Sequence, residues 1–482
     1  MIDNSIHLRR ELMIRFIRAF HNGTLEQELD QIPIRMRPKD GASSRCCIYH
    51  DRAVLKYRLL NLLGVSCNEE TDEAKTLAEY YREKDAGRMA SQEEQSGEDG
   101  SGSSPAADEE RPCRHPLSVC EAACSECPAS RVVVTGNCRG CFSRPCMFTC
   151  PKKAISIVDQ KSTINESLCI KCGKCVSACP FHAIVKTTVP CEESCPTSAI
   201  HKDDQGHTTI DYAKCIACGN CLAKCPFSAI MEKSQVLDVL LALKAGEKLV
   251  AVIAPSAAAQ LPGTIEQLFT AVSRLGFCDV MEVALGAEET SRHEAAEFKE
   301  RMAKGEKLMT TSCCSAYVEM VRKLLPSFLP HVSSTPSPMI YAVEIARREI
   351  PGCKVVFIGP CVAKRIEAQR KGVDFVLNFE ELGAMLAGRG IDVIACEPWK
   401  LTRPALPSAR NYCRSCGVTK AVLEEAGDLP EGFQLDAKFI DGIDRKTLAM
   451  LKMYDAGKLP ANFLEVMSCP GGCINGPCSL RK

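Results

Sequence analysis

The sequence of 482 residues has few aromatic residues, no long apolar run and no net charge. Sixty basic and sixty acidic side chains cancel, so no strong field toward nucleic acid or an anionic membrane surface is expected. The longest apolar stretches, such as residues 249–259, are far shorter than the roughly 20 residues that a membrane span requires. The first residues, MIDNSIHLRREL, contain no apolar leader. These absences predict a cytoplasmic protein that binds neither nucleic acid nor membrane.

Cysteine, in contrast, is abundant, with 32 residues. In a small secreted protein this number would indicate disulfide bonds, but most of these cysteines have the spacing of metal ligands and no leader precedes them. Thiolates bind soft, thiophilic centres such as iron–sulfur clusters. We therefore expect a reduced protein of two to four domains in which cysteine serves as a metal ligand.

A repeated motif, CPxxAI, predicts ferredoxin-like modules within residues 113–234 and begins at Cys150, Cys179, Cys195 and Cys225. Two copies end the complete bacterial ferredoxin run C-x2-C-x2-C-x3-C-P, in which the fourth cysteine ligates the cluster of the neighbouring run. That rule predicts three accessory [4Fe–4S] clusters. Their ligands would be Cys138, Cys141, Cys146 and Cys179; Cys169, Cys172, Cys175 and Cys150; and Cys195, Cys215, Cys218 and Cys221.

Six cysteines of this block have no cluster under the same rule. They could hold a fourth accessory cluster, or they could be leftover thiols of a decayed repeat, and both alternatives stay open. The six are Cys113, Cys120, Cys124, Cys127, Cys191 and Cys225.

Three further cysteine stretches lie near the C-terminus: TTSCCSAY at 310–317, IGPCVAKR at 358–365 and EVMSCPGGCINGPC at 465–478. Small residues and prolines surround their cysteines, which lets backbone amides approach sulfur closely. Short apolar runs at 249–254, 279–285, 308–312 and 354–359 predict buried strands, with helices at 288–304 and 339–348. The three stretches would then lie at strand ends or helix starts, where α/β proteins present their sites.

Together the three stretches resemble the signature loops of the [FeFe]-hydrogenases, which have the general forms TSCCPxW, xPCxxKK and ExMxCxGGCxxGG in the same order. The resemblance covers roughly residues 130–482. It implies an H-cluster, a [4Fe–4S] cubane joined to a diiron unit with CO, cyanide and dithiolate ligands. The cubane ligands implied are Cys314, Cys361, Cys469 and Cys473, with Cys473 as the bridge to the diiron unit.

The resemblance also implies roles for residues around this cluster. Cys313 takes the place of the proton donor, Lys364 that of a residue bonded to one cyanide, and the APS segment at 254–256 that of the loop at the other. In the family a relay of carboxylates and a serine leads protons to the thiol. Glu294 and Glu297 have the three-residue spacing of one helix face. The implied relay is Glu297, Ser337 and Glu294, and the implied cofactor contacts are Ala254, Pro255, Ser256 and Met467.

Several residues depart from the family pattern. Ser315 replaces a proline, Tyr317 a tryptophan and Gly359 a methionine that packs on the diiron unit. The end of a glycine run is replaced by residues 477–478, and CRSCGVTKAVLEE at 413–425 replaces a glycine-rich segment. These departures indicate a divergent, monomeric subgroup similar to group B, whose catalytic bias stays open.

The N-terminal 84 residues predict a helical module, because Leu8, Leu12, Phe16 and Phe20 recur at fourfold spacing. A capping box is expected at residues 24–27 and a further helix at 51–63. Three cysteines of this module are expected to be buried thiols rather than ligands, namely Cys46, Cys47 and Cys67.

The predicted architecture is α/β: a helical module at 1–84, a flexible acidic linker at 85–112, ferredoxin-type modules at 113–234 and a two-lobed catalytic domain at 235–482. The resemblance implies reversible proton reduction and H2 oxidation. Ferredoxin or a similar low-potential carrier would exchange the electrons, and hydrogenase maturation proteins would be required. Two alternatives stay open: a hydrogenase-like sensor of hydrogen or redox state, and an iron–sulfur assembly-type protein without hydrogen turnover.

Overall fold

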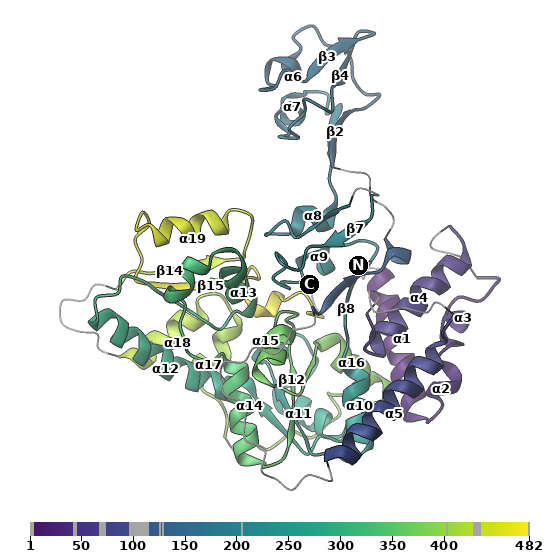
Figure 1. The fold of residues 1–482 in the computed structure, drawn as a ribbon, viewed down its shortest axis with the longest axis vertical. Coiled ribbons are helices and arrows are strands. Elements are labelled where there is room, and N and C mark those ends of the chain that lie inside the picture. Colours follow the sequence, from purple (N-terminus) through teal and green to yellow (C-terminus); the bar gives the residue numbers. More distant parts are fainter. Residues whose placement is uncertain are drawn as a thin grey trace.

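The computed structural model describes residues 4–41, 46–66, 74–95, 115–124, 127, 130–203, 206–401, 403–427 and 435–480. Within these ranges the chain forms a helical N-terminal module, two small ferredoxin-like units and two α/β lobes (Figure 1). Cys67, Cys113 and most of the expected linker lie outside the described residues. None of the described helices is long and apolar enough to span a membrane.

The N-terminal module contains α1 (Asn4–His21), α2 (Leu25–Glu28), α3 (Ile32–Met36), α4 (Ile48–Leu62) and α5 (Leu77–Gln95). Leu12, Phe16 and Phe20 are buried, which confirms the fourfold apolar spacing. The module shares one apolar core with the catalytic domain, and α1 packs on α16 (Phe379–Gly388). Helix α5 extends to Gln95, beyond the boundary expected at residue 84.

Two expectations for this module are wrong. No capping box forms at residues 24–27, because α2 is a single turn and the Thr24 hydroxyl donates to Glu28 instead, at 2.5 Å. Cys46 and Cys47 are exposed rather than buried, since they precede α4 at the module surface.

The first ferredoxin-like unit spans residues 131–187 and projects from the rest of the molecule (Figure 1). It contains β2 (Arg131–Val134), α6 (Pro145–Phe148), β3 (Ile155–Val158), β4 (Lys161–Ile164), α7 (Lys174–Ala178) and β5 (Ile184–Thr187). Antiparallel pairs β2–β5 and β3–β4 enclose a small core that includes several of the expected ligand thiols.

The second unit packs against the catalytic domain. It contains β1 (Leu117–Val119), α8 (Pro190–Ser194), β6 (Ile200–Lys202), β7 (Thr208–Ile210), α9 (Asn220–Lys224) and β8 (Ile230–Glu232). Its core is continuous with that of the second lobe. Gly219 has a φ of +75°, and an added Cβ would stand 2.6 Å from the ring of Pro477, so only glycine allows this close approach to the C-terminal loop.

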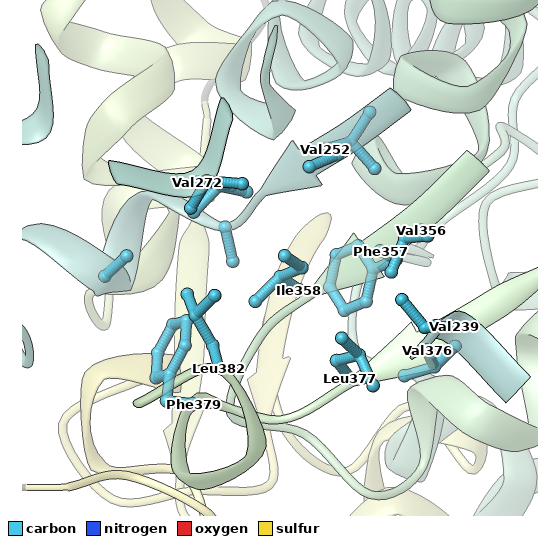
Figure 2. Packing of buried hydrophobic residues seen from close by; sticks show 14 of the residues in the cluster. Val239, Val252, Val272, Val356, Phe357, Ile358, Val376, Leu377, Phe379 and Leu382 are labelled. Atoms are coloured by element: carbon cyan, nitrogen blue, oxygen red, sulfur yellow. The ribbon is translucent and has the colours of Figure 1, made fainter. Parts of the chain in front are cut away.

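The first lobe is built on a parallel sheet of strand order β10-β9-β12-β13. The strands are β9 (Leu249–Ile253), β10 (Asp279–Glu282), β12 (Lys354–Ile358) and β13 (Phe375–Leu377). Its helices include α10 (Val236–Lys244), α11 (Ile265–Ser273), α14 (Pro338–Glu349) and α15 (Lys364–Lys371). Figure 2 shows side chains of β9, β12 and β13 meeting those of α10, α11 and α16 in an apolar core.

The second lobe holds a parallel sheet of order β11-β15-β14, with β11 (Met309–Thr310), β14 (Ala437–Asp441) and β15 (Phe463–Met467). Its helices are α13 (Ser315–Leu324), α17 (Pro407–Arg410), α18 (Gly417–Ala426) and α19 (Thr447–Asp455). The long helix α12 (Val283–Ala303) packs on both α14 and α18 and so joins the lobes. The expected two-lobed α/β architecture is confirmed.

Candidate active site

Four loops that leave parallel strands meet between the two lobes. The loops after β9 and β12 come from neighbouring strands of the first sheet, and those after β11 and β15 from neighbouring strands of the second. Carboxyl ends of parallel strands lie at one edge of a sheet, so the four loops face a common pocket. The three cysteine stretches and the APS segment occupy these four loops.

The pocket gathers the four thiols expected to hold the cubane. Burial, together with the charge of Cys314, raises the pKa of Cys361 to about 11. Burial also raises the pKa of Cys469, with added repulsion from Cys473, Cys361 and Cys314. These thiols cannot ionise together without a compensating cation, which is what a cluster of iron ions supplies.

The pocket wall carries the residues expected to contact the rest of an H-cluster: Ala254, Pro255, Ser256, Lys364 and Met467, together with Cys313. The hydroxyl of Ser256 is buried and has no hydrogen-bond partner among the described residues, and the same holds for Ser468 in the wall. A buried hydroxyl without a partner is unfavourable unless a ligand completes it. The site therefore fits a cofactor that carries polar groups on an otherwise apolar face.

Lys364 belongs to a buried network of its own, which we name the lysine cluster: Lys364, Glu367, Ser337 and Ser315. Lys364 Nζ donates to Glu367 Oε2 at 2.6 Å, to Ser337 Oγ at 2.9 Å and to the Cys313 carbonyl at 3.3 Å. The hydroxyls of Ser337 and Ser315 both donate to the Glu367 carboxylate. The cation is thus fixed beside the pocket by an adjacent anion.

The sequence placed Ser337 between Glu294 and Glu297 in the relay, but its hydroxyl bonds to Glu367 instead. Ser337 precedes α14, and that position directs its hydroxyl to Glu367 on α15 rather than to α12. The hydroxyl that lies between the two expected carboxylates is that of Ser333. It donates to Glu297 Oε2 at 2.6 Å and lies close enough to the Glu294 carboxyl to lower its pKa.

Glu294 and Glu297 share one face of α12, as their spacing predicts, yet their environments differ. Glu294 is fully buried and accepts the Ser312 N–H at 3.0 Å, while its second oxygen has no partner among the described residues. Burial raises the pKa of Glu294 to about 7. We name Glu294, Ser312, Ser333 and Glu297 the carboxylate cluster.

Glu297 stands at the outer end of this cluster. Burial alone would raise its pKa, but donors from Ser333, Ser334 and Thr335 lower it. Arg301 pairs with Glu297 at 2.6 Å and lines a surface cavity together with Ser333 and Thr335. The cluster thus extends from this surface cavity to the buried Glu294 carboxyl.

At the inner end, Cys313 lies in the pocket wall beside Cys314. Burial raises the pKa of Cys313 well above its ordinary range, and the charge of Glu294 is the largest of the neighbouring charges that raise it further. A thiol in this setting stays protonated at neutral pH.

Several accessory thiols of the first ferredoxin-like unit share one small core. Burial raises the pKa of Cys175, as do the charges of Cys169, Cys172 and Cys150. Cys146 and Cys179 belong to the same small core, while Cys138 and Cys141 lie on the loop after β2.

The third set approaches the pocket. Burial raises the pKa of Cys218 to about 12, with contributions from Cys215, Cys195 and Cys361. Cys221 joins the same set. Since Cys361 is a thiol of the pocket, this accessory site lies directly beside the expected cubane.

Comparison with known proteins supports the resemblance carried by the three cysteine stretches. Residues 247–477 match the family described as iron only hydrogenase large subunit, C-terminal domain, and residues 162–185 match a 4Fe-4S binding domain. Residues 185–236 match an LdpA Fe-S cluster-binding domain. The catalytic domain at residues 247–477 therefore belongs to the [FeFe]-hydrogenase family.

Individual relatives of this [FeFe]-hydrogenase family member are distant. Iron hydrogenase 1 of Clostridium pasteurianum is 28% identical over 68% of this chain and 66% of its own. The periplasmic [Fe] hydrogenase large subunit of Nitratidesulfovibrio vulgaris is 28% identical over 44% of this chain and 62% of its own. A probable cytosolic Fe-S cluster assembly factor of Culex quinquefasciatus is 24% identical over 36% and 47%. The chain therefore spans less than two thirds of the length of these relatives.

The structure shows how this hydrogenase-family site accommodates its departures. A Cβ on Gly359 would stand 2.8 Å from the ring of Phe357, which itself lines the pocket. The aromatic ring thus occupies the space that a larger residue at 359 would need. Tyr317 is buried, and its hydroxyl lies 2.7 Å from that of Thr310.

Sequence reasoning missed several wall residues, among them Phe357 and Tyr412. Phe357 was assigned only to a strand, and Tyr412 directly precedes the segment that departs from the family pattern. The Tyr412 hydroxyl lies 2.7 Å from that of Ser291 on α12. No sequence signal marked Tyr412, whereas the hydroxyl run at 333–337 marked the region of Ser333 without selecting the residue. Cys478 lies away from this pocket and donates to Glu232.

Proposed function

We propose that the chain is an iron hydrogenase that catalyses reversible proton reduction and H2 oxidation. The observation that carries the proposal is the convergence, in one buried pocket, of four ligand thiols with Cys313, Lys364 and the unpartnered Ser256 hydroxyl. A protein that held only a cubane would have no use for a second thiol and a fixed cation beside it.

The H-cluster, when bound, supplies the redox-active iron at which protons and electrons combine. Cys314, Cys361, Cys469 and Cys473 would hold its cubane, with Cys473 as the bridging thiolate. Lys364 and Ser256 would donate to its polar ligands. The apolar wall formed by Phe357, Met467 and neighbouring residues excludes bulk water from the pocket.

Proton transfer follows from the carboxylate cluster. Glu297 accepts protons at the surface cavity, Ser333 passes them inward, and Glu294 holds one beside Cys313. Ser333 has a single hydroxyl proton between two carboxylates, so it can donate to one only while accepting from the other. Cys313 keeps a neutral thiol at rest, which avoids a buried charge in the pocket.

Electron transfer follows from the accessory thiols. The set of Cys195, Cys215, Cys218 and Cys221 lies next to Cys361, and the projecting first unit would exchange electrons with ferredoxin or a similar low-potential carrier. Assembly of the diiron unit would require hydrogenase maturation proteins. A cytoplasmic location is part of this proposal, although one relative is named periplasmic.

The second candidate is an iron–sulfur assembly-type protein, which the match to an assembly factor favours. Infrared spectroscopy of the matured protein separates the two, because CO and cyanide bands arise only from a diiron unit. We expect these bands in the native chain and their loss in Cys473→Ser, since a hydroxyl is a poor ligand for soft metals. Absence of the bands from a matured chain that retains its cubane would refute the hydrogenase proposal.

A further inference from the structure

Four alanine amides mark ligand thiols in the repeated CPxxAI motif. Ala154 N–H donates to Cys150 Sγ at 3.3 Å, and Ala183 N–H donates to Cys179 Sγ at 3.4 Å. The same bond recurs at Cys195, at 3.2 Å, and at Cys225, at 3.4 Å. A backbone N–H aimed at sulfur stabilises the thiolate form and tunes the bound cluster.

The rule that the fourth cysteine of a run ligates the cluster of the neighbouring run assigns Cys150, Cys179 and Cys195 to a cluster. It leaves Cys225 without one. Its thiol nevertheless has the same backbone donor, on the same turn of the repeat, as the other three. The exchange rule places its cluster on the preceding copy of the run, which retains Cys191 as its third position. That copy lacks the first two cysteines.

A C-x2-C pair from another part of the chain, Cys124 and Cys127, lies near the Cys225 turn. Strand β1 pairs antiparallel with β8, with Val119 opposite Ile230, and the Cys120 N–H donates to the Ala229 carbonyl at 2.8 Å. The chain that follows β1 therefore begins beside the Cys225 turn. Within it, Cys124 and Cys127 have the two-residue spacing that the incomplete copy has lost.

The thiols of this pair lie among those of the second ferredoxin-like unit. The Cys124 thiol donates to the Thr208 hydroxyl at 3.5 Å. Cys124 and Cys225 both pack against the apolar cluster that contains Cys120, Ala123 and Ala229. Cys127 and Cys225 both pack against the larger core that contains Cys191.

We propose that Cys124, Cys127, Cys191 and Cys225 hold a fourth accessory [4Fe–4S] cluster. It pairs with the cluster of Cys195, Cys215, Cys218 and Cys221 across α8 and α9, just as the two clusters of the projecting unit pair across α6 and α7. Cys120 is a fifth, structural thiol, because it packs with Val54, Ala229 and Met231 in an apolar cluster.

The N-terminal module covers this site. The His50 side chain on α4 lies 2.5 Å, through Nε2, from the carbonyl of Ala122, two residues before the proposed ligand Cys124. Val54 of the same helix closes the apolar cluster around Cys120. The module therefore shields the fourth cluster from solvent on this side.

Iron and sulfide analysis of the full-length chain, reconstituted without maturation proteins, tests the proposal independently of hydrogen turnover. Five cubane sites give about 20 iron atoms per chain, whereas four give about 16. We expect about 20 in the native chain and about 16 in both Cys124→Ala/Cys127→Ala and Cys191→Ala/Cys225→Ala. The electron paramagnetic resonance spectrum of each reduced double variant should lose one cluster's signal.

Two single variants serve as matched controls. Cys278→Ala removes an exposed thiol of the catalytic domain, and Cys120→Ala removes the fifth thiol, so both should retain about 20 iron atoms. A native count near 16, or a count near 20 in either double variant, would overturn the fourth cluster. A loss of four iron atoms in Cys120→Ala would overturn the ligand set.

Discussion

Two buried polar clusters flank Cys313, and they differ in how their carboxylates are balanced. In the lysine cluster, burial alone would raise the pKa of Glu367, but Lys364 and two serine hydroxyls outweigh it and lower it. In the carboxylate cluster, no cation pairs directly with Glu294 in the described structure, and burial raises its pKa to about 7. Both clusters border the same surface cavity.

The comparison separates two uses of a buried carboxyl group. Glu367 stays ionised over the working pH range and fixes the position of Lys364. Glu294 can hold or release a proton near neutral pH, which is what efficient general acid–base transfer requires. Both clusters lie close to Cys313, so under the proposed function the local counter-charge, and not the distance to Cys313, determines which of them can transfer protons.

The largest expected effect comes from Glu294→Gln, which keeps the shape of the side chain and removes its titration. Hydrogen evolution should fall on the order of 10²-fold, the scale for losing a positioned acid–base group. The CO and cyanide bands should remain. Glu300→Gln, an exposed position on the same helix, is the matched control and should behave like the native chain. A native rate in Glu294→Gln would remove the carboxylate cluster from the proton path.

Glu367→Gln should act on stability instead. It leaves Lys364, whose side chain is 12% exposed, without its anion, which costs about 3 kcal/mol of unfolding free energy. We expect a lower unfolding midpoint and an unchanged pH profile of turnover. If Glu367→Gln abolished the pH dependence and left stability unaltered, the roles of the two clusters would be reversed.

The two serines give a smaller and more specific contrast. Ser333→Ala should slow hydrogen evolution on the order of tenfold, since a water molecule can partly replace the hydroxyl. Ser337→Ala should leave proton delivery intact, because its hydroxyl serves Glu367. If both substitutions lowered the rate of hydrogen evolution equally under one set of conditions, Ser333 would have no special role in proton transfer, and this assignment would be wrong.

The smallest effect is the pH dependence itself. The folded protein holds the Glu294 proton up to about pH 7, so hydrogen evolution in the native chain should fall as the pH rises through this value. The transition should be missing from Glu294→Gln. A native profile that is flat between pH 6 and 8 would mean that another group delivers the proton.

The sequence predicted the parts of the molecule that depend on local pattern. Apolar runs marked β9 and β12, and cysteine spacing marked the loops that follow strands. The choice between Ser333 and Ser337 could not be made in this way, because both lie in one hydroxyl-rich run. Only their partners in the folded chain separate them, since Ser337 donates to Glu367 on α15 and Ser333 donates to Glu297 on α12. The exposure of Cys46 and Cys47 likewise depends on how α4 is oriented, which no spacing records.

The pocket wall shows the same limit. Phe357 fills the space beside Gly359 only because the strand directs its ring there, and Tyr412 contacts Ser291 on α12 although no sequence motif marks it. The N-terminal module had no interpretable motif, yet it shares a core with the first lobe and covers the proposed fourth cluster. Apart from the contact of Phe357 with Gly359, these contacts join residues far apart in the sequence and leave no periodic signal.

The most direct test of the account is hydrogen evolution by the matured chain, measured beside Cys313→Ala with the infrared bands as a loading control. The account predicts hydrogen from the native chain. The variant should keep its CO and cyanide bands but evolve hydrogen on the order of 10²-fold more slowly. A fully loaded native chain that neither evolves nor consumes hydrogen, or a Cys313→Ala variant as fast as the native chain, would contradict it.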